Sequence, residues 1–220
     1  MLGITNSMNF FDGLDGLATG LTIICSSFLG ILAFKTMQPY LMLLSVALAG
    51  SCLGFLPYNF GYRNPAVIFL GDAGSTFMGF MLAGMVLMGG WGGEDPIKAY
   101  AMPILIMDIF IFDMVYTTAS RIASKRIISF NQWLEFTGKD HLHHRLIGLG
   151  LSVKQTVFFI YFLTASLGLS ALVLKNGSIL DALLILLQAV TIYLIIVILM
   201  LRGRLRSRRK EDQVKEKEQM

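Results

Sequence analysis

The sequence predicts an all-α membrane protein whose chain crosses the bilayer several times. Hydrophobic residues make up 55% of the 220 residues, charged residues only 15%, and the mean hydropathy is +0.67. The apolar stretches are about 18 to 23 residues long, the length that a helix needs to cross about 30 Å of hydrocarbon. The alternating pattern of a transmembrane barrel is absent. We expect six spans, at about 14–34, 40–57, 72–90, 97–119, 153–174 and 179–201.

The connections between the spans differ in length and composition. Those at 35–39, 91–96 and 175–178 are short and marked by Gly or Pro, so the flanking helices should be antiparallel neighbours. The loop at 120–152 is long for a compact protein, which indicates a functional role. The segment 202–220 is highly charged, and we expect a basic, poorly ordered tail.

Basic residues divide unevenly between the two sides of the membrane. Threading the six spans places fifteen of the 18 lysines and arginines on one side and only Lys35, Lys98 and Lys175 on the other. Because cytoplasmic loops are enriched in positive charge, we expect the richer side to be cytoplasmic, in a multi-pass protein of the inner or plasma membrane. The net charge of +4 is then a topology signal. The expected partner is the lipid bilayer, and no nucleic acid is expected.

A polar motif at 5–16, Thr-Asn-Ser-Met-Asn-Phe-Phe-Asp-Gly-Leu-Asp-Gly, precedes the first span; we call it the Asn/Asp motif. Its members Asn6, Asn9, Asp12 and Asp15 recur at every third position. In a helix the two aspartates would lie about 60° apart and form a carboxylate pair at the mouth of the first span. The two asparagines are then expected in an entry turn. Four polar groups exceed what a helix cap needs, which favours a functional site over a simple helix start.

A second motif, Gly71-Asp72-Ala73-Gly74-Ser75, opens the third predicted span; we call it the Gly-Asp motif. An Asp between glycines at a helix start can hold a divalent cation, while the free N–H groups of the helix receive phosphate. Taken alone, the motif fits an ordinary N-cap by Asp72 or Ser75 at least as well.

The third motif, His141-Leu142-His143-His144-Arg145-Leu146, contains all three histidines of the chain; we call it the histidine motif. Three imidazoles and a guanidinium make a donor-rich patch that suits phosphate. A zinc site is less favoured, because no Cys is near and the histidines are not spaced i, i+4.

Two aspartates interrupt the fourth predicted span, where a charge costs about 2.5–3.5 kcal/mol on insertion scales. Asp108 and Asp113 are five residues apart, so they project about 140° from one another in a helix. Asp113 lies nearer to the side of the motifs and is a possible site residue, whereas Asp108 is expected to pair with another helix. Arg121 is expected to mark the membrane interface.

Together these motifs resemble those of the polyprenyl-phosphate N-acetylhexosamine-1-phosphate transferases, of the glycosyltransferase family 4 type. The matching segments are 6–18, 71–75, 112–113 ahead of Arg121, and 141–146, in the order of the family. The resemblance implies transfer of a sugar 1-phosphate from a UDP-N-acetylhexosamine to polyprenyl (undecaprenyl) phosphate with release of UMP, at the start of cell-wall or surface-glycan synthesis. The form of the histidine motif, with Arg145, resembles the branch that uses UDP-N-acetylglucosamine.

The resemblance also implies roles for single residues. The aspartate that matches Asp72 binds Mg²⁺ in related enzymes, with Mn²⁺ as the alternative. The positions that match Phe69 and residues 13–15 line the uracil pocket, and the histidine motif lies by the diphosphate. We therefore expect catalytic residues at Asp12, Asp15, His141, His143, His144 and Arg145, substrate-binding residues at Asn6, Asn9, Gly13, Leu14, Asp15, Phe69 and Ser75, the metal at Asp72, and a possible contribution from Asp113.

The resemblance is partial. Family members carry several more helices before the Asn/Asp motif, with an adjacent Asp-Asp pair that is implicated in handling the lipid phosphate, and these 220 residues contain no such pair. Residues 1–201 are thus expected to form the C-terminal catalytic portion, completed by missing N-terminal helices or a second polypeptide; a homodimer is also open, as is activity of this chain alone. The alternatives are an inactive membrane subunit of the same family and an ion-coupled transporter.

Overall fold

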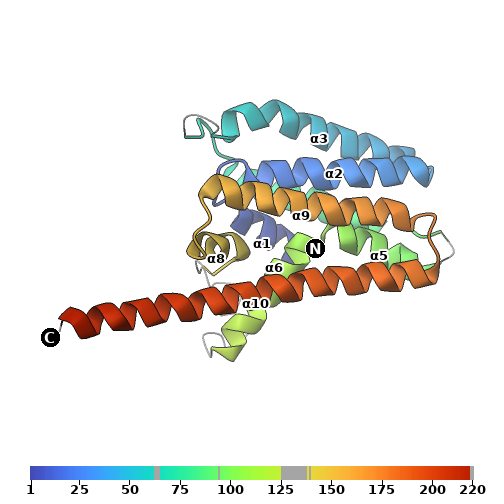
Figure 1. Ribbon diagram of the computed structural model, residues 1–220. Helices are drawn as coiled ribbons and strands as arrows, with labels where there is room; N and C mark the ends of the chain where they lie inside the picture. The colour runs from blue at the N-terminus through green and yellow to red at the C-terminus, as the bar shows by residue number, and fades with distance from the viewer. Residues whose placement is uncertain (62–64, 94, 125–137, 139, 219–220) are drawn as a thin grey trace.

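The computed structural model describes residues 1–61, 65–93, 95–124, 138 and 140–218, with side chains up to residue 203. All regular elements of this part of the chain are helices (Figure 1), which confirms the predicted all-α class. They are α1 (Leu2–Phe11), α2 (Leu17–Lys35), α3 (Pro39–Asn59), α4 (Gly71–Met88), α5 (Pro96–Ile106), α6 (Asp108–Ala123), α8 (Leu142–Gly148), α9 (Val153–Leu174) and α10 (Ile179–Glu218).

Five helices are long and apolar enough to cross a membrane, and the bent pair α5–α6 makes a sixth if it counts as one span. The prediction of a single helix over 97–119 is wrong, because α5 and α6 meet at a bend of 79°. Pro103 lies inside α5 and cannot donate a backbone hydrogen bond there, which weakens the helix just before the break. Asp108 begins α6, and the hydroxyl of Tyr193 on α10 donates a hydrogen bond to its carboxylate, as predicted for an acid that pairs with another helix.

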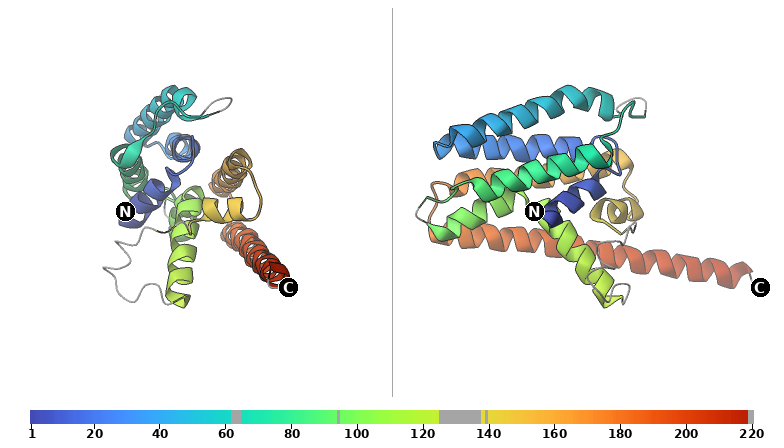
Figure 2. Two further views of the ribbon diagram at one scale, coloured as in Figure 1. Left: turned by 90° about the vertical axis from the view of Figure 1, so that its left-hand side faces the viewer. Right: turned by 180° about the vertical axis from the view of Figure 1, so that it is seen from behind.

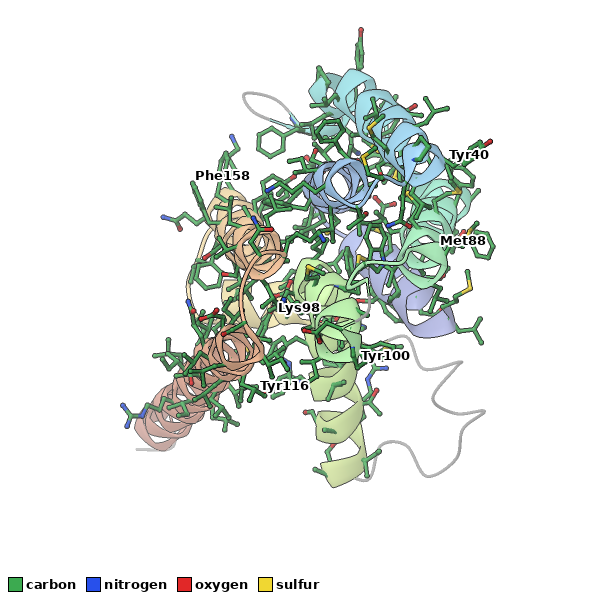
Figure 3. All side chains as sticks on the ribbon, turned by 90° about the vertical axis from the view of Figure 1, so that its right-hand side faces the viewer. Tyr40, Met88, Lys98, Tyr100, Tyr116 and Phe158 are labelled. Carbon is green, nitrogen blue, oxygen red and sulfur yellow. The ribbon has the colours of Figure 1, made fainter. Side chains whose placement is uncertain are left out.

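The helices pack as a bundle in which α2 lies beside both α3 and α9, antiparallel to α3 and parallel to α9 (Figures 1 and 2). Glycines allow the close packing of α2 against α9, since a Cβ at Gly20 would overlap Tyr161 and one at Gly168 would overlap Phe28. Large apolar side chains point outwards, as Tyr40 and Phe158 do in Figure 3. An apolar exterior is what a lipid-facing bundle requires.

The three motifs lie at one end of the bundle, where α1 ends, α2 and α4 begin and α8 lies; we call it the motif end (at the left in Figure 1). The three lysines that threading separates from the other basic residues lie at or next to the opposite ends of α2, α5 and α9. This arrangement agrees with the predicted division of charge between the two sides.

Two predictions about local structure differ from the fold. Asn6 and Asn9 lie within the helix α1 and not in an entry turn, while Asp12 and Asp15 lie in the turn between α1 and α2 and not on a helix. The reason is Gly16, whose positive φ of 76° ends the turn in a left-handed conformation that favours glycine. The basic segment after residue 201 continues the helix α10 up to Glu218, because strong helix formers dominate it.

Residues 125–137 and 139 of the predicted loop lie outside the described residues. The described remainder of 120–152 contains the end of α6 and the seven-residue helix α8, which carries most of the histidine motif. The fold therefore places the histidine motif, within this described remainder, at the motif end beside α1 and α6.

Candidate active site

Asn9 joins the Asn/Asp motif to the Gly-Asp motif. Its Nδ2 donates hydrogen bonds to Oδ1 of Asp72 at 2.9 Å and to Oγ of Ser75 at 3.0 Å, although Asn9 and Asp72 are 63 residues apart in the chain. The helices α1 and α4 come this close because Gly79 has no side chain: a Cβ there would lie 2.8 Å from Cα of Thr5. The two motifs thus form one site.

Asp12 completes a pair of carboxylates with Asp72. Partial burial, together with the negative charge of Asp72, raises the pKa of Asp12 to about 6, while a hydrogen bond from the Gly71 backbone lowers it. Among the described residues, no Lys, Arg or His forms an ion pair with either carboxylate. This part of the motif end is therefore rich in oxygen, and the described side chains give its two carboxylates no ion pair.

The Gly-Asp motif does open a helix, but neither of its polar side chains caps it. The N-cap residue of α4 is Leu70, without a side-chain cap, and the Ser75 hydroxyl donates to the Gly71 carbonyl at 2.9 Å. The alternative of a simple N-cap by Asp72 or Ser75 is therefore wrong. Gly71 has a positive φ of 64°, so the turn into α4 favours glycine.

The turn between α1 and α2 is held by contacts from other parts of the fold. Oδ2 of Asp15 accepts a hydrogen bond from the Ala66 N–H at 3.0 Å, and the Tyr161 hydroxyl on α9 donates to the Gly16 carbonyl at 2.5 Å. Asp15 thereby fixes the segment that leads to Phe69, whose side chain is 65% exposed. Leu14 packs against the core, and Gly13 lies at the exposed surface of the turn.

His143 connects the histidine motif to this turn. Its side chain is 1% exposed, and a Cβ at Gly13 would lie 3.4 Å from its Nε2. Neither ring nitrogen has a hydrogen-bond partner among the described residues. Burial, assisted by the neighbouring imidazoles of His144 and His141, lowers the pKa of His143 to about 3, although Asp113 opposes the shift. His143 is thus a neutral imidazole with unused nitrogens beside the turn.

His141 has a different environment. Its Nδ1 lies 2.7 Å from Oδ2 of Asp113, its Nε2 lies 3.3 Å from Nη2 of Arg121, and its ring stacks on Phe10 at a centroid distance of 4.0 Å. Both ring nitrogens are therefore engaged. His144 is partly exposed, with its ring centroid 4.2 Å from that of His143.

Arg145 is bound by the chain itself. Its Nε donates to the Asp140 carbonyl at 2.5 Å, its Nη2 donates to Oγ of Ser120 at 3.1 Å, and the guanidinium lies 4.8 Å from the ring centroid of Tyr116 (labelled in Figure 3).

Asp113 lies at the histidine motif. Sequence reasoning did not predict the roles of Arg121 and Asp140 at the same motif. Arg121 is 3% exposed and forms a two-point ion pair with Asp140, at 2.8 and 2.6 Å. Burial raises the pKa of Asp140, but the hydrogen bond and charge of Arg121 outweigh it and hold the pKa below its usual value. The available signal was the position of Asp140 immediately before the first histidine.

Asn6 lies apart from the Asp72 cluster. It lines a small pocket between α1 and α6 together with Thr117, Arg121 and His141. The Thr117 hydroxyl is buried and has no hydrogen-bond partner among the described residues. The structure thus brings Asn9, Asp12, Asp72 and Ser75 together and directs Asn6 to the other side of α1.

Comparisons with known proteins identify similar sequences. Residues 1–90 match the sequence model of glycosyl transferase family 4. The chain is 38% identical over 179 residues to a probable undecaprenyl-phosphate N-acetylglucosaminyl 1-phosphate transferase of Bacillus subtilis, covering 81% of this chain and 47% of that protein. It is 34% identical over 178 residues to a decaprenyl-phosphate N-acetylglucosaminephosphotransferase of Mycobacterium leprae, covering 73% of this chain and 42% of that protein.

A phospho-N-acetylmuramoyl-pentapeptide-transferase of Clostridium beijerinckii is 30% identical over 168 residues, covering 74% of this chain and 45% of that protein. The chain thus spans less than half the length of each of these three relatives. The similarity extends over most of this chain, including the part that holds the motifs.

Proposed function

Because this chain belongs to glycosyl transferase family 4, among the polyprenyl-phosphate hexosamine-1-phosphate transferases, we propose that it carries the nucleotide-sugar and metal site of such an enzyme. The reaction is transfer of N-acetylglucosamine 1-phosphate from UDP-N-acetylglucosamine to polyprenyl phosphate, with release of UMP. One observation supports this most: Asn9 holds the Gly-Asp motif against the Asn/Asp motif, beside Asp12, and no basic side chain of the described residues forms an ion pair with Asp12 or Asp72.

The proposed cofactor is Mg²⁺, with Mn²⁺ as the alternative. Among the described residues, no three His, Cys, Asp or Glu side chains form a complete metal cage. Mg²⁺ is commonly held by one or two carboxylates and completed by water and substrate phosphates, and Asp72 with Asp12 provides that donor set. The bound ion would offset negative charge on the phosphoryl oxygens. Asn9 on α1 donates to the Asp72 carboxylate and to the Ser75 hydroxyl, so it orients the Asp72 carboxylate and ties it to α4.

The nucleotide is proposed to lie along the turn between α1 and α2. Residues 13–15 and the exposed ring of Phe69 are joined through the hydrogen bond from Ala66 to Asp15, so an aromatic face and a turn are available to a uracil base. His143 lies beside Gly13 with two buried ring nitrogens that have no partner among the described residues, so it is the proposed donor to a diphosphate oxygen. His144 is partly exposed on α8, and its ring centroid lies 4.2 Å from that of His143.

The proposed sugar is N-acetylglucosamine. Two relatives that are named for this sugar are 38% and 34% identical to the chain. The relative that is named for N-acetylmuramoyl-pentapeptide is 30% identical. The proposed location of the site is the cytoplasmic face, which is supported by the concentration of basic residues at the motif end. The acids on which a transporter would depend, Asp108 and Asp113, are both hydrogen-bonded within the protein, so no observation favours that alternative.

The test is an assay of UMP release and lipid-linked product from UDP-N-acetylglucosamine and undecaprenyl phosphate, with and without Mg²⁺. The assay uses this chain and a version extended by the coding sequence upstream of Met1. Activity only in the extended form supports a role as the C-terminal portion. Nucleotide binding without turnover in both would favour the subunit alternative.

Two variants locate the site. Asp72→Asn should abolish turnover, while Phe69→Ala should mainly raise the KM for the nucleotide sugar. Phe162→Ala is the matched control, because this ring is 74% exposed on α9, outside the motifs. Near-normal kinetics in both site variants would overturn the assignment.

A further inference from the structure

The histidine helix α8 takes its N-terminal cap from α6. Its N-cap residue, His141, provides no side-chain cap. Instead, Oδ1 of Asp113 accepts a hydrogen bond from the Leu142 N–H at 2.7 Å, while Oδ2 of the same carboxylate binds the His141 ring. Asp113 is 1% exposed, so both bonds are shielded from water and strengthened by the low local polarity. One buried acid thus sets the start of α8 and the orientation of its first imidazole.

The contacts of His141 select one tautomer. Asp113 has only acceptor oxygens when ionised, so Nδ1 of His141 must carry the proton. Arg121 has only N–H donors, so Nε2 must present its lone pair to the guanidinium. A ring with Nδ1–H and a bare Nε2 satisfies both partners. With both nitrogens used and Phe10 on one face, His141 has no ring nitrogen left for a substrate.

Two further contacts hold the rest of the segment on α6. Arg121 binds both carboxylate oxygens of Asp140. Arg145 binds Ser120 and lies over Tyr116. The contacting residues of α6 fall at positions 113, 116, 120 and 121, the i, i+3, i+7, i+8 spacing of a single helix face.

We propose that this face of α6 positions the histidine motif, so that His141 and Arg145 hold α8 in place and His143 is the imidazole that meets the substrate. Asp113, Arg121 and Asp140 are then positioning residues, which act through α8. The kinetic part of this inference rests on the proposed function, whereas the spectroscopic part does not.

The spectroscopic test uses the number of histidines. The chain has three, so ¹⁵N-histidine labelling of the full protein in lipid gives three imidazoles, and His141→Gln assigns the first. The expected spectrum of His141 has a protonated Nδ1, with a proton resonance shifted downfield by the carboxylate, and an unprotonated Nε2. Asp113→Asn should remove the downfield resonance and change the His143 signals. Asp95→Asn, at a helix start at the opposite end, should change none of them.

The kinetic test separates positioning from binding. Asp113→Asn should lower kcat by about 10- to 100-fold and leave the KM for the nucleotide sugar within about twofold, because misplacement of α8 affects the diphosphate and not the base. Asp113→Glu should restore part of kcat. Arg121→Lys keeps the charge but loses the two-point contact with Asp140, and it provides the same comparison if Asp113→Asn does not fold.

The outcomes are distinct. A protonated Nε2 on His141 in the wild type, or unchanged imidazole signals in the Asp113 or Arg121 variant, would overturn the positioning role. If Asp113→Asn instead raised the KM for the nucleotide sugar by the factor expected for kcat and left kcat unchanged, that result would also contradict the positioning role. If neither this chain nor the extended form transfers sugar phosphate, the proposed function fails, and the imidazole spectra still decide whether α6 positions α8.

Discussion

The motif end of the bundle contains two groups of carboxylates with opposite surroundings. Asp72 is exposed and Asp12 half-buried, and neither forms an ion pair with a basic side chain in the described part of the chain. Asp113 and Asp140 are bound by His141 and Arg121. An acid without a counter-charge attracts an external cation, whereas an acid with a buried partner fixes the geometry of that partner.

This difference separates two kinds of acid at the motif end. The first group has the composition of a metal and phosphate site. The second has the composition of a structural support, although it lies next to the first along α1, where Asn9 faces Asp72 and Phe10 faces His141. Adjacent residues of one helix thus contact both groups.

The largest expected effect contrasts an acid from each group. Asp72→Asn should reduce Mg²⁺-dependent transfer by about 10³-fold or more and change the stability by less than about 0.5 kcal/mol, because the side chain is exposed. Asp113→Ala should destabilise the protein by about 3–5 kcal/mol, since it leaves buried donors without a partner. UMP release measures the transfer rate of each variant, and thermal unfolding in detergent measures its stability. Equal losses of stability would contradict the contrast.

A smaller effect is expected where α1 supports the first group. Asn9→Ala removes both hydrogen bonds to the Gly-Asp motif and should weaken the apparent affinity for Mg²⁺ by about 10-fold or more. Titration of activity with Mg²⁺ measures the change. Asn176→Ala, at an exposed turn at the opposite end, is the control and should leave the titration unchanged. Equal titrations for wild type and Asn9→Ala would remove Asn9 from the metal site.

The contact between α1 and α4 can be tested without changing any polar group. A Cβ at Gly79 would lie 2.8 Å from Cα of Thr5, so Gly79→Ala should push the helices apart and destabilise the fold by on the order of 1 kcal/mol. Gly50→Ala is the matched control, because a Cβ there meets nothing within 4 Å, and it should be neutral or stabilising. Thermal unfolding measures the stability of both variants. Equal melting temperatures would mean that the packing of α1 against α4 does not depend on Gly79.

The smallest expected effect is a pH dependence from His143. Its pKa is lowered from 6.5 to about 3, so the folded protein binds fewer protons than the unfolded chain between these values. Stability should therefore fall as the pH decreases from 6.5 towards 3, by on the order of 0.5 kcal/mol between pH 7 and 6. His143→Gln should flatten the curve of melting temperature against pH in this range. An unchanged slope would mean that His143 is not held neutral.

Sequence reasoning predicted the class of the protein and most of its helices. Runs of apolar residues of membrane-spanning length predicted five of the six spans to within a few residues, because run length is a local property. The three motifs also carried enough local pattern to indicate the family. The same reasoning failed at the α5–α6 bend and at the turn between α1 and α2.

The roles of the charged residues were decided by the tertiary structure. Composition and spacing place His141 and His143 in one motif, yet the first is bound by α6 and the second faces the turn at Gly13. The partners that make this difference, Asp113 and Arg121, are 28 and 20 residues from His141 in the chain. A helix forms from contacts within four residues, so the sequence alone was enough to predict most of the helices. The counter-charge of a buried acid comes from a distant segment, and only packing of the bundle brings it within hydrogen-bonding distance.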